Sequence, residues 1–131
     1  MVVEDNPTDV FLVREALRAQ GLEVDLQVFE DGEAAITFVQ QLDADDTFDC
    51  PSLVLLDVNL PRADGFTVFR CLRSSTKCGS IFVIVMTSSA ALTDRTTVTA
   101  LRADAYFQKP PSYDAFLKLG ALAQRMLGEQ R

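Results

Sequence analysis

Several residues with charged or hydroxyl side chains directly follow apolar runs of this 131-residue chain. Glu4 and Asp5 form an adjacent acidic pair, and Asp57, Thr87 and Lys109 follow later runs. If the apolar runs are parallel strands, their carboxyl ends meet at one edge of a sheet, where an open α/β fold places its reactive groups. Such a grouping predicts metal-assisted phosphoryl chemistry.

Asp57 ends the apolar run 53–56 and lies at the mouth of a buried strand. A carboxylate there is partly desolvated, but taken alone it is explained equally well as a turn residue. Together with Glu4 and Asp5 it forms a trio of carboxylates that repel one another unless a divalent cation binds. Mg²⁺ prefers few carboxylates, retained waters and phosphate oxygens, so we predict Mg²⁺ at this trio.

Lys109 supplies the remaining positive charge, because the formal charges of three carboxylates, one Mg²⁺ and one lysine cancel. A phosphoryl group on Asp57 adds roughly one negative charge, which a lysine can contact directly. Thr87 can donate a hydrogen bond to a phosphoryl oxygen, and Ser89 keeps the following loop small. Taken singly, each residue has an ordinary explanation: Lys109 as a surface charge, Thr87 as a strand end and Ser89 as a turn residue.

The composition narrows the class of protein. A formal net charge of −7 argues against a nucleic-acid partner, which needs clustered Lys and Arg. The chain has no histidine, so it lacks an internal histidine phosphodonor. The longest apolar stretch, 81–86, is too short to cross a bilayer, and no signal peptide is recognisable, so we expect a cytoplasmic protein without a membrane partner.

The three cysteines, Cys50, Cys71 and Cys78, have no close-paired spacing. Neither a disulfide framework nor a zinc site is indicated by that arrangement, and we predict reduced structural thiols.

Short apolar runs alternate with amphipathic segments, which is typical of βαβ units around a parallel sheet. The predicted strands are 1–3, 24–29, 53–56, 81–86 and 105–107. The runs 53–56 and 81–86 are apolar without alternation, as expected of central strands buried on both faces. The predicted helices are 6–20, 31 to the acidic loop 43–49, 64–73, 93–101 and 112–127. The length fits one domain, 1–131, with no output domain.

The chain resembles the receiver domains of two-component response regulators over essentially its whole length. The segments that carry this resemblance are 2–6, 55–65, 83–87 and 103–110. The resemblance implies an α/β, flavodoxin-like, doubly wound five-stranded parallel sheet in the order 2-1-3-4-5 with five helices. It also implies a signalling protein that catalyses only its own phosphoryl transfer and dephosphorylation.

Carried over by position, the resemblance makes Asp57 the phosphoacceptor. Glu4 and Asp5 become the acidic pair that holds Mg²⁺, and Asn59 would offer its backbone carbonyl to the metal.

The same resemblance makes Thr87 and Lys109 the groups that contact the phosphoryl oxygens. It implies a cis bond between Lys109 and Pro110, which would place the lysine. Tyr106 corresponds to the switch aromatic, although a half-buried strand tyrosine is an equally good explanation of that residue.

The segments 6–9 and 59–61 are especially similar to stand-alone receivers that work with phytochrome-type or other hybrid sensor kinases. The implied phosphodonor is a histidine kinase or a histidine phosphotransfer protein, and the implied output is a downstream protein partner. In such receivers the face made by the fourth helix, fifth strand and fifth helix switches and commonly mediates a homodimer.

Three departures from the family pattern concern packing rather than chemistry. Arg102 stands where the family usually has glycine, and Pro111 stands where it has a bulky apolar residue. Few residues precede the acidic pair, so we expect a shortened first strand, which bears on stability and metal affinity.

Three alternatives remain open. The pattern also suits an aspartate-nucleophile phosphohydrolase, although the chain has no material for a substrate-selecting cap. A flavodoxin-like nucleotide or flavin binder is disfavoured because no glycine-rich loop follows the first strand. The third alternative is an interaction receiver that is not phosphorylated.

Overall fold

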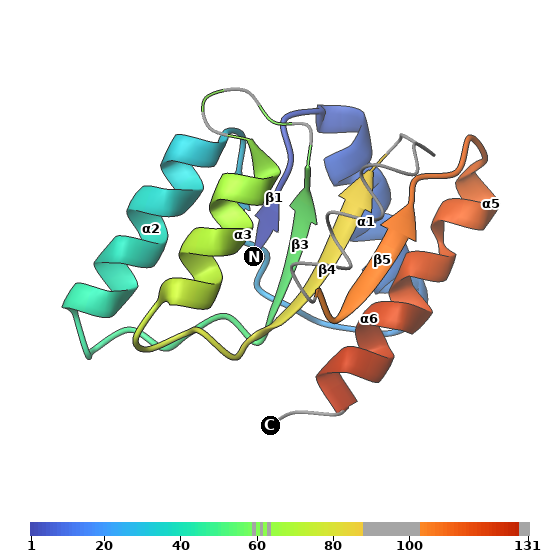
Figure 1. Cartoon of the computed structure of the whole chain (residues 1–131). Coiled ribbons are helices and arrows are strands. Elements are labelled where there is room, and N and C mark those ends of the chain that lie inside the picture. The colour runs from blue at the N-terminus through green and yellow to red at the C-terminus, as the bar shows by residue number, and fades with distance from the viewer. Residues whose placement is uncertain (59, 61, 63, 88–102, 129–131) are drawn as a thin grey trace.

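A computed structural model of the chain has a five-stranded parallel sheet in the order β2-β1-β3-β4-β5 (Figure 1). The structure describes residues 1–58, 60, 62, 64–87 and 103–128. The strands are β1 (Val2–Val3), β2 (Val28–Phe29), β3 (Leu53–Asp57), β4 (Phe82–Thr87) and β5 (Ala105–Gln108). This order confirms the predicted flavodoxin-like topology.

Helices cover both faces of the sheet (Figure 1). They are α1 (Pro7–Ala19), α2 (Gly32–Ala44), α3 (Gly65–Ser74), α5 (Tyr113–Phe116) and α6 (Lys118–Gly128). The prediction of one helix over 112–127 was wrong, because a tight turn at Leu117, closed by a bond from the Gly120 N–H to the Leu117 carbonyl at 3.0 Å, separates α5 from α6. The predicted helix 93–101 lies outside the described residues.

Polar side chains fix where the first three helices begin. Asn6, Asp31 and Asp64 each accept a hydrogen bond from a backbone N–H in the first turn of the helix that follows, at 2.9, 2.8 and 2.9 Å respectively. Such caps satisfy N–H groups that have no partner within the helix. The predicted starts are therefore confirmed, whereas α2 continues to Ala44, past its predicted end.

The core has two halves, one on each face of the sheet. β3 and β4 are buried throughout, and alternate side chains point to opposite faces. Val54 and Leu56 join the cluster beneath α2 and α3, while Leu53 and Leu55 join the cluster beneath α1, α5 and α6. This packing confirms β3 and β4 as central strands and holds their carboxyl ends rigidly.

The predicted second strand, 24–29, was wrong over its first four residues, since β2 contains only Val28 and Phe29. The parallel ladder between β1 and β2 pairs Val2 with Val28 and Val3 with Phe29, and residues 24–27 lie outside it. Those residues instead line a pocket of about 240 Å³ at the amino end of the sheet.

The cysteine prediction was also wrong, because Cys50 and Cys78 form a disulfide with a Cα–Cα separation of 5.6 Å. Parallel pairing places Leu53 of β3 beside Phe82 of β4, so the segments that precede these strands also lie side by side. Spacing along the sequence does not reveal that proximity. Cys71 on α3 is a free, partly buried thiol.

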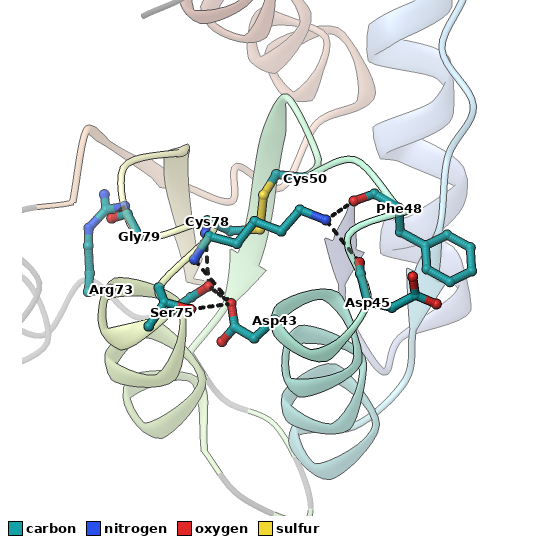
Figure 2. The surroundings of a disulfide bond; sticks show 10 residues. Asp43, Asp45, Phe48, Cys50, Arg73, Ser75, Cys78 and Gly79 are labelled. Carbon is teal, nitrogen blue, oxygen red and sulfur yellow. Dashed lines mark hydrogen bonds between the residues drawn. A yellow bond between two sulfur atoms is a disulfide. The ribbon is translucent and has the colours of Figure 1, made fainter.

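Polar contacts reinforce the joint between the two segments (Figure 2). The Asp43 carboxylate accepts hydrogen bonds from the Ser75 hydroxyl at 2.5 Å and from the Lys77 backbone N–H at 3.2 Å. The Lys77 ammonium donates to the carbonyls of Asp45 and Phe48. The disulfide therefore lies within a polar network that ties the end of α2 to the loop after α3.

None of the described helices is both long enough and apolar enough to traverse a bilayer.

Candidate functional site

The carboxyl edge of the sheet brings together the residues singled out from the sequence. Glu4 follows β1, Asp57 ends β3, Thr87 ends β4 and Lys109 follows β5. The backbone N–H of Lys109 donates to the Thr87 carbonyl at 2.7 Å, which continues the β4–β5 ladder by one bond. The hydroxyl and lysine positions are therefore fixed relative to each other by the backbone.

Lys109 lies at the centre of the carboxylates. Its Nζ atom is 2.5 Å from Oε1 of Glu4, 2.9 Å from Oδ2 of Asp9 and 3.0 Å from Oδ2 of Asp57. Only 8% of the lysine side chain is exposed. Because an ammonium group has three donors, these contacts account for all of them.

Sequence reasoning missed Asp9 as a member of this site, since its position in the first turn of α1 fits a favourable interaction with the helix dipole. The available signal was its location at the same sheet edge, four residues after Asp5. Its charge also changes the formal net charge of the site. With Mg²⁺ bound, four carboxylates and one lysine would leave one negative charge, where three carboxylates would leave none.

Glu4, Asp5 and Asp57 form a set that fits a divalent cation. Each offers one oxygen, and the three oxygens lie within 4.8 Å of one another. Mg²⁺ binds oxygen ligands at about 2.1 Å, so these side chains would draw closer together around the ion. Asp5 is exposed while Glu4 and Asp57 are buried, which leaves one side open for the waters that Mg²⁺ retains.

Burial and the neighbouring Asp57 side chain raise the pKa of the Glu4 carboxyl to about 8, against the opposing effect of Lys109. Burial alone would lower the pKa of the Lys109 ammonium, but hydrogen bonds to Glu4 and Asp9 and the charge of Asp57 raise it above its ordinary value. The lysine is therefore charged at neutral pH, and cation binding to Glu4 competes with a proton.

Close backbone packing sets the position of Asp57. The Val58 N–H donates to the Met86 carbonyl at 3.2 Å, and the Gly65 N–H donates to the Val58 carbonyl at 3.1 Å. A Cβ at Gly65 would lie 2.4 Å from Val58 Cα and 2.5 Å from the Asp57 carbonyl oxygen. Glycine is thus required for α3 to begin this close to the end of β3.

Tyr106 lies on β5 opposite Val85, is partly buried and packs against the cluster beneath α2 and α3. That position fits both a switch aromatic and an ordinary half-buried strand tyrosine, so the switch role of Tyr106 stays a prediction.

The expected cis bond between Lys109 and Pro110 was wrong, since this bond is trans. The intrinsically preferred isomer suffices because the lysine is already placed by its bond to the Thr87 carbonyl and by the three carboxylates. Asn59, Ser89 and Arg102 lie outside the described residues.

Comparison with known proteins shows that the chain is similar to response regulators. A model of the response regulator receiver domain matches residues 1–119. The response regulator Rcp1 of Synechocystis sp. is 31% identical over 119 residues, which cover 91% of this chain and 81% of Rcp1. The transcriptional regulatory protein TcrA of Mycobacterium tuberculosis is 36% identical over 126 residues, which cover 95% of this chain and 46% of TcrA.

Solved structures agree with the sequence relatives. The Mn²⁺-bound form of Rcp1 matches with a TM-score of 0.85 at 29% identity, over 99% of this chain and 94% of that one. The phosphorylated cyanobacterial phytochrome response regulator RcpA matches with a TM-score of 0.85 at 26% identity, over 98% of this chain and 91% of that one.

Proposed function

This chain belongs to the response regulator receiver domain family, and on that premise we propose that Asp57 is the residue that accepts the phosphoryl group in two-component signalling. The observation that carries the proposal is the position of its carboxylate, 3.0 Å from the Lys109 ammonium and within the oxygen set that fits a cation. Asp57 is only 4% exposed, so water competes weakly for these contacts.

The transfer forms one P–O bond and breaks one bond to the donor. A carboxylate oxygen of Asp57 attacks the phosphorus of a phosphohistidine, the P–N bond breaks, and the imidazole leaves with the electron pair and takes up a proton. Lys109 stabilises negative charge on the transferring oxygens, and the Thr87 hydroxyl donates a hydrogen bond to one of them. Mg²⁺ held by Glu4, Asp5 and Asp57 would supply further positive charge at those oxygens.

Family membership supports a histidine kinase or a histidine phosphotransfer protein as the donor. A phytochrome-type kinase is the specific candidate, because RcpA is named as a phytochrome response regulator. We place this exchange in the cytoplasm, and we propose that the protein acts on no other substrate, in contrast to the phosphohydrolase alternative. Hydrolysis of the acyl phosphate on Asp57 returns the receiver to its resting state.

Phosphorylation is expected to shift the population between two states of the face that includes β5 and α5. Tyr106 is the proposed switch residue on that face, and a homodimer and a downstream protein are its proposed partners. Size-exclusion chromatography with light scattering, before and after phosphorylation, tests the dimer.

The decisive experiment incubates the protein with phosphoramidate and Mg²⁺ and measures its intact mass. We expect a single phosphoryl adduct that EDTA suppresses and that Asp57→Asn lacks. Asp64→Asn is the matched control, because Asp64 caps α3 near the site without contacting Lys109 through any described bond. An adduct of equal yield in Asp57→Asn would contradict the assignment, and turnover of organic phosphate monoesters would favour the phosphohydrolase.

A further inference from the structure

Among the described residues that contact the Lys109 ammonium, Asp9 is the one that the proposed transfer does not use. Its Oδ2 atom lies 2.9 Å from the Lys109 Nζ atom, and 19% of its side chain is exposed. The pair joins the first turn of α1 to the residue after β5, two positions that are 100 residues apart in the sequence. Such a contact is part of the tertiary structure and more than a local helix-dipole effect.

The three carboxylates around Lys109 differ in what else they can bind. Glu4 and Asp57 belong to the oxygen set that fits a cation, and among the described residues that set is completed by Asp5. A divalent ion would therefore bind two of the three carboxylates that contact Lys109, namely Glu4 and Asp57. Asp9 lies outside the set, so its carboxylate remains with the lysine when the ion binds.

We propose that Asp9 is a positioning residue that keeps the Lys109 ammonium beside the oxygens of Asp57 after Mg²⁺ has engaged Glu4 and Asp57. The inference rests on the proposed function of Asp57. Without Asp9, the flexible four-carbon side chain loses the one partner among the described residues that it does not share with the cation, and its ammonium turns toward water for part of the time.

Asp9 also adds negative charge near an anionic phosphoryl group, which opposes transfer. We expect the attraction between Asp9 and the Lys109 ammonium to exceed the repulsion between Asp9 and the phosphoryl group. Asp9 contacts the ammonium directly, whereas the ammonium lies between Asp9 and Asp57. Coulomb energy falls with distance, so the direct contact outweighs the longer repulsion.

The test compares Asp9→Ala, Asp9→Asn and wild type in phosphorylation by acetyl phosphate at saturating Mg²⁺, with initial rates from intact mass. We expect Asp9→Ala to be slower by about tenfold, the size of one lost charge-assisted hydrogen bond. Asp9→Asn keeps an oxygen acceptor and should recover about a third of the wild-type rate. Glu33→Ala, which removes an exposed acid from the first turn of α2, is the matched control and should change nothing.

A double-mutant cycle separates positioning from a general structural effect. In a Lys109→Ala background, Asp9→Ala should change the rate by less than about twofold, because the group that Asp9 positions is gone. An equal tenfold loss in that background would overturn the proposal, as would Asp9 variants that are as fast as wild type or faster. Circular dichroism and thermal unfolding check that each variant is folded.

These results separate a failure of the proposed function of Asp57 from a failure of the proposed role of Asp9. If wild type gains a phosphoryl group on Asp57 and the Asp9 variants match it, the proposed function stands and the role of Asp9 is overturned. If wild type gains none, the proposed function fails and the role of Asp9 fails with it.

Discussion

The Nζ atom of Lys109 lies 3.0 Å from Oδ2 of Asp57, although the two residues are 52 positions apart in the sequence. The contact spans β4, which lies between β3 and β5 in the sheet. Lys109 reaches across because its backbone is anchored to the Thr87 carbonyl while its side chain runs along the sheet edge. The same ammonium therefore faces both the cation ligands and the acceptor oxygen.

Replacing Lys109 by alanine should move two measurements in opposite directions. Phosphorylation by acetyl phosphate should slow by about 100-fold, because a preorganised charge that stabilises the transferring oxygens is lost. Mg²⁺ affinity should rise by about fivefold, because the ammonium no longer competes for Glu4 and Asp57. Intact-mass kinetics and isothermal titration calorimetry measure the two effects.

Lys118→Ala is the matched control for this prediction, since Lys118 is an exposed lysine at the start of α6. It should leave both the rate and the Mg²⁺ affinity unchanged. A fall in Mg²⁺ affinity in Lys109→Ala would show that the lysine supports the carboxylates more than it competes for them, contrary to the prediction.

Mg²⁺ binding should strengthen as the pH rises from about 6 to about 8. Burial and the Asp57 side chain raise the pKa of Glu4 from 4.5 to about 8, so over this range the cation must displace a proton from the carboxyl group. Calorimetry in two buffers of different ionisation enthalpy should detect proton release on binding. Glu4→Gln should abolish that release while leaving weaker, pH-independent binding.

The same raised pKa determines whether the metal-free protein becomes more or less stable as the pH rises. The native state holds the Glu4 proton more tightly than the unfolded state, so this contribution to stability is fully present below about pH 4.5 and is lost as the pH rises through about 8. Mg²⁺ should therefore raise the melting temperature more at pH 8 than at pH 6. A Mg²⁺ effect that is equal at both pH values in wild type would contradict this linkage.

The sheet and five of the site residues could be predicted because they depend on local patterns; these are Glu4, Asp5, Asp57, Thr87 and Lys109. The uninterrupted apolar runs before Asp57 and Thr87 identify central strands, and the end of each strand gives the position of the polar residue. Glu4 and Lys109 follow from the same rule at β1 and β5.

The sequence-based predictions failed for features that depend on residues distant in the sequence. The extent of β2 depends on its pairing with β1, and the partner of Cys50 depends on the pairing of β3 with β4. Asp9 was missed because a first-turn acid is ordinary on any helix, and only the path of the Lys109 side chain makes it part of the site.

Gly65→Ala should disturb Asp57 through the backbone alone. The added Cβ would lie 2.4 Å from Val58 Cα and 2.5 Å from the Asp57 carbonyl oxygen, and neither atom can move without shifting the end of β3. We expect a loss of about 1–3 kcal/mol in unfolding free energy and a slower phosphorylation rate. Gly128→Ala is the matched control, because a Cβ there meets no atom within 4 Å. Wild-type stability and rate in Gly65→Ala would contradict the close approach.

Reducing the Cys50–Cys78 bridge should lower stability while leaving phosphorylation almost unchanged. The bridge closes a loop across 28 positions, so its loss should cost about 3–4 kcal/mol and lower the melting temperature by about 10 °C. It joins the amino ends of β3 and β4, whereas Asp57 lies at the carboxyl end, so the phosphorylation rate should change by less than about twofold. Thermal unfolding with and without dithiothreitol, and in Cys50→Ser, measures the effect, with Cys71→Ser as the control. Three reactive thiols in the unfolded, unreduced protein would contradict the bridge.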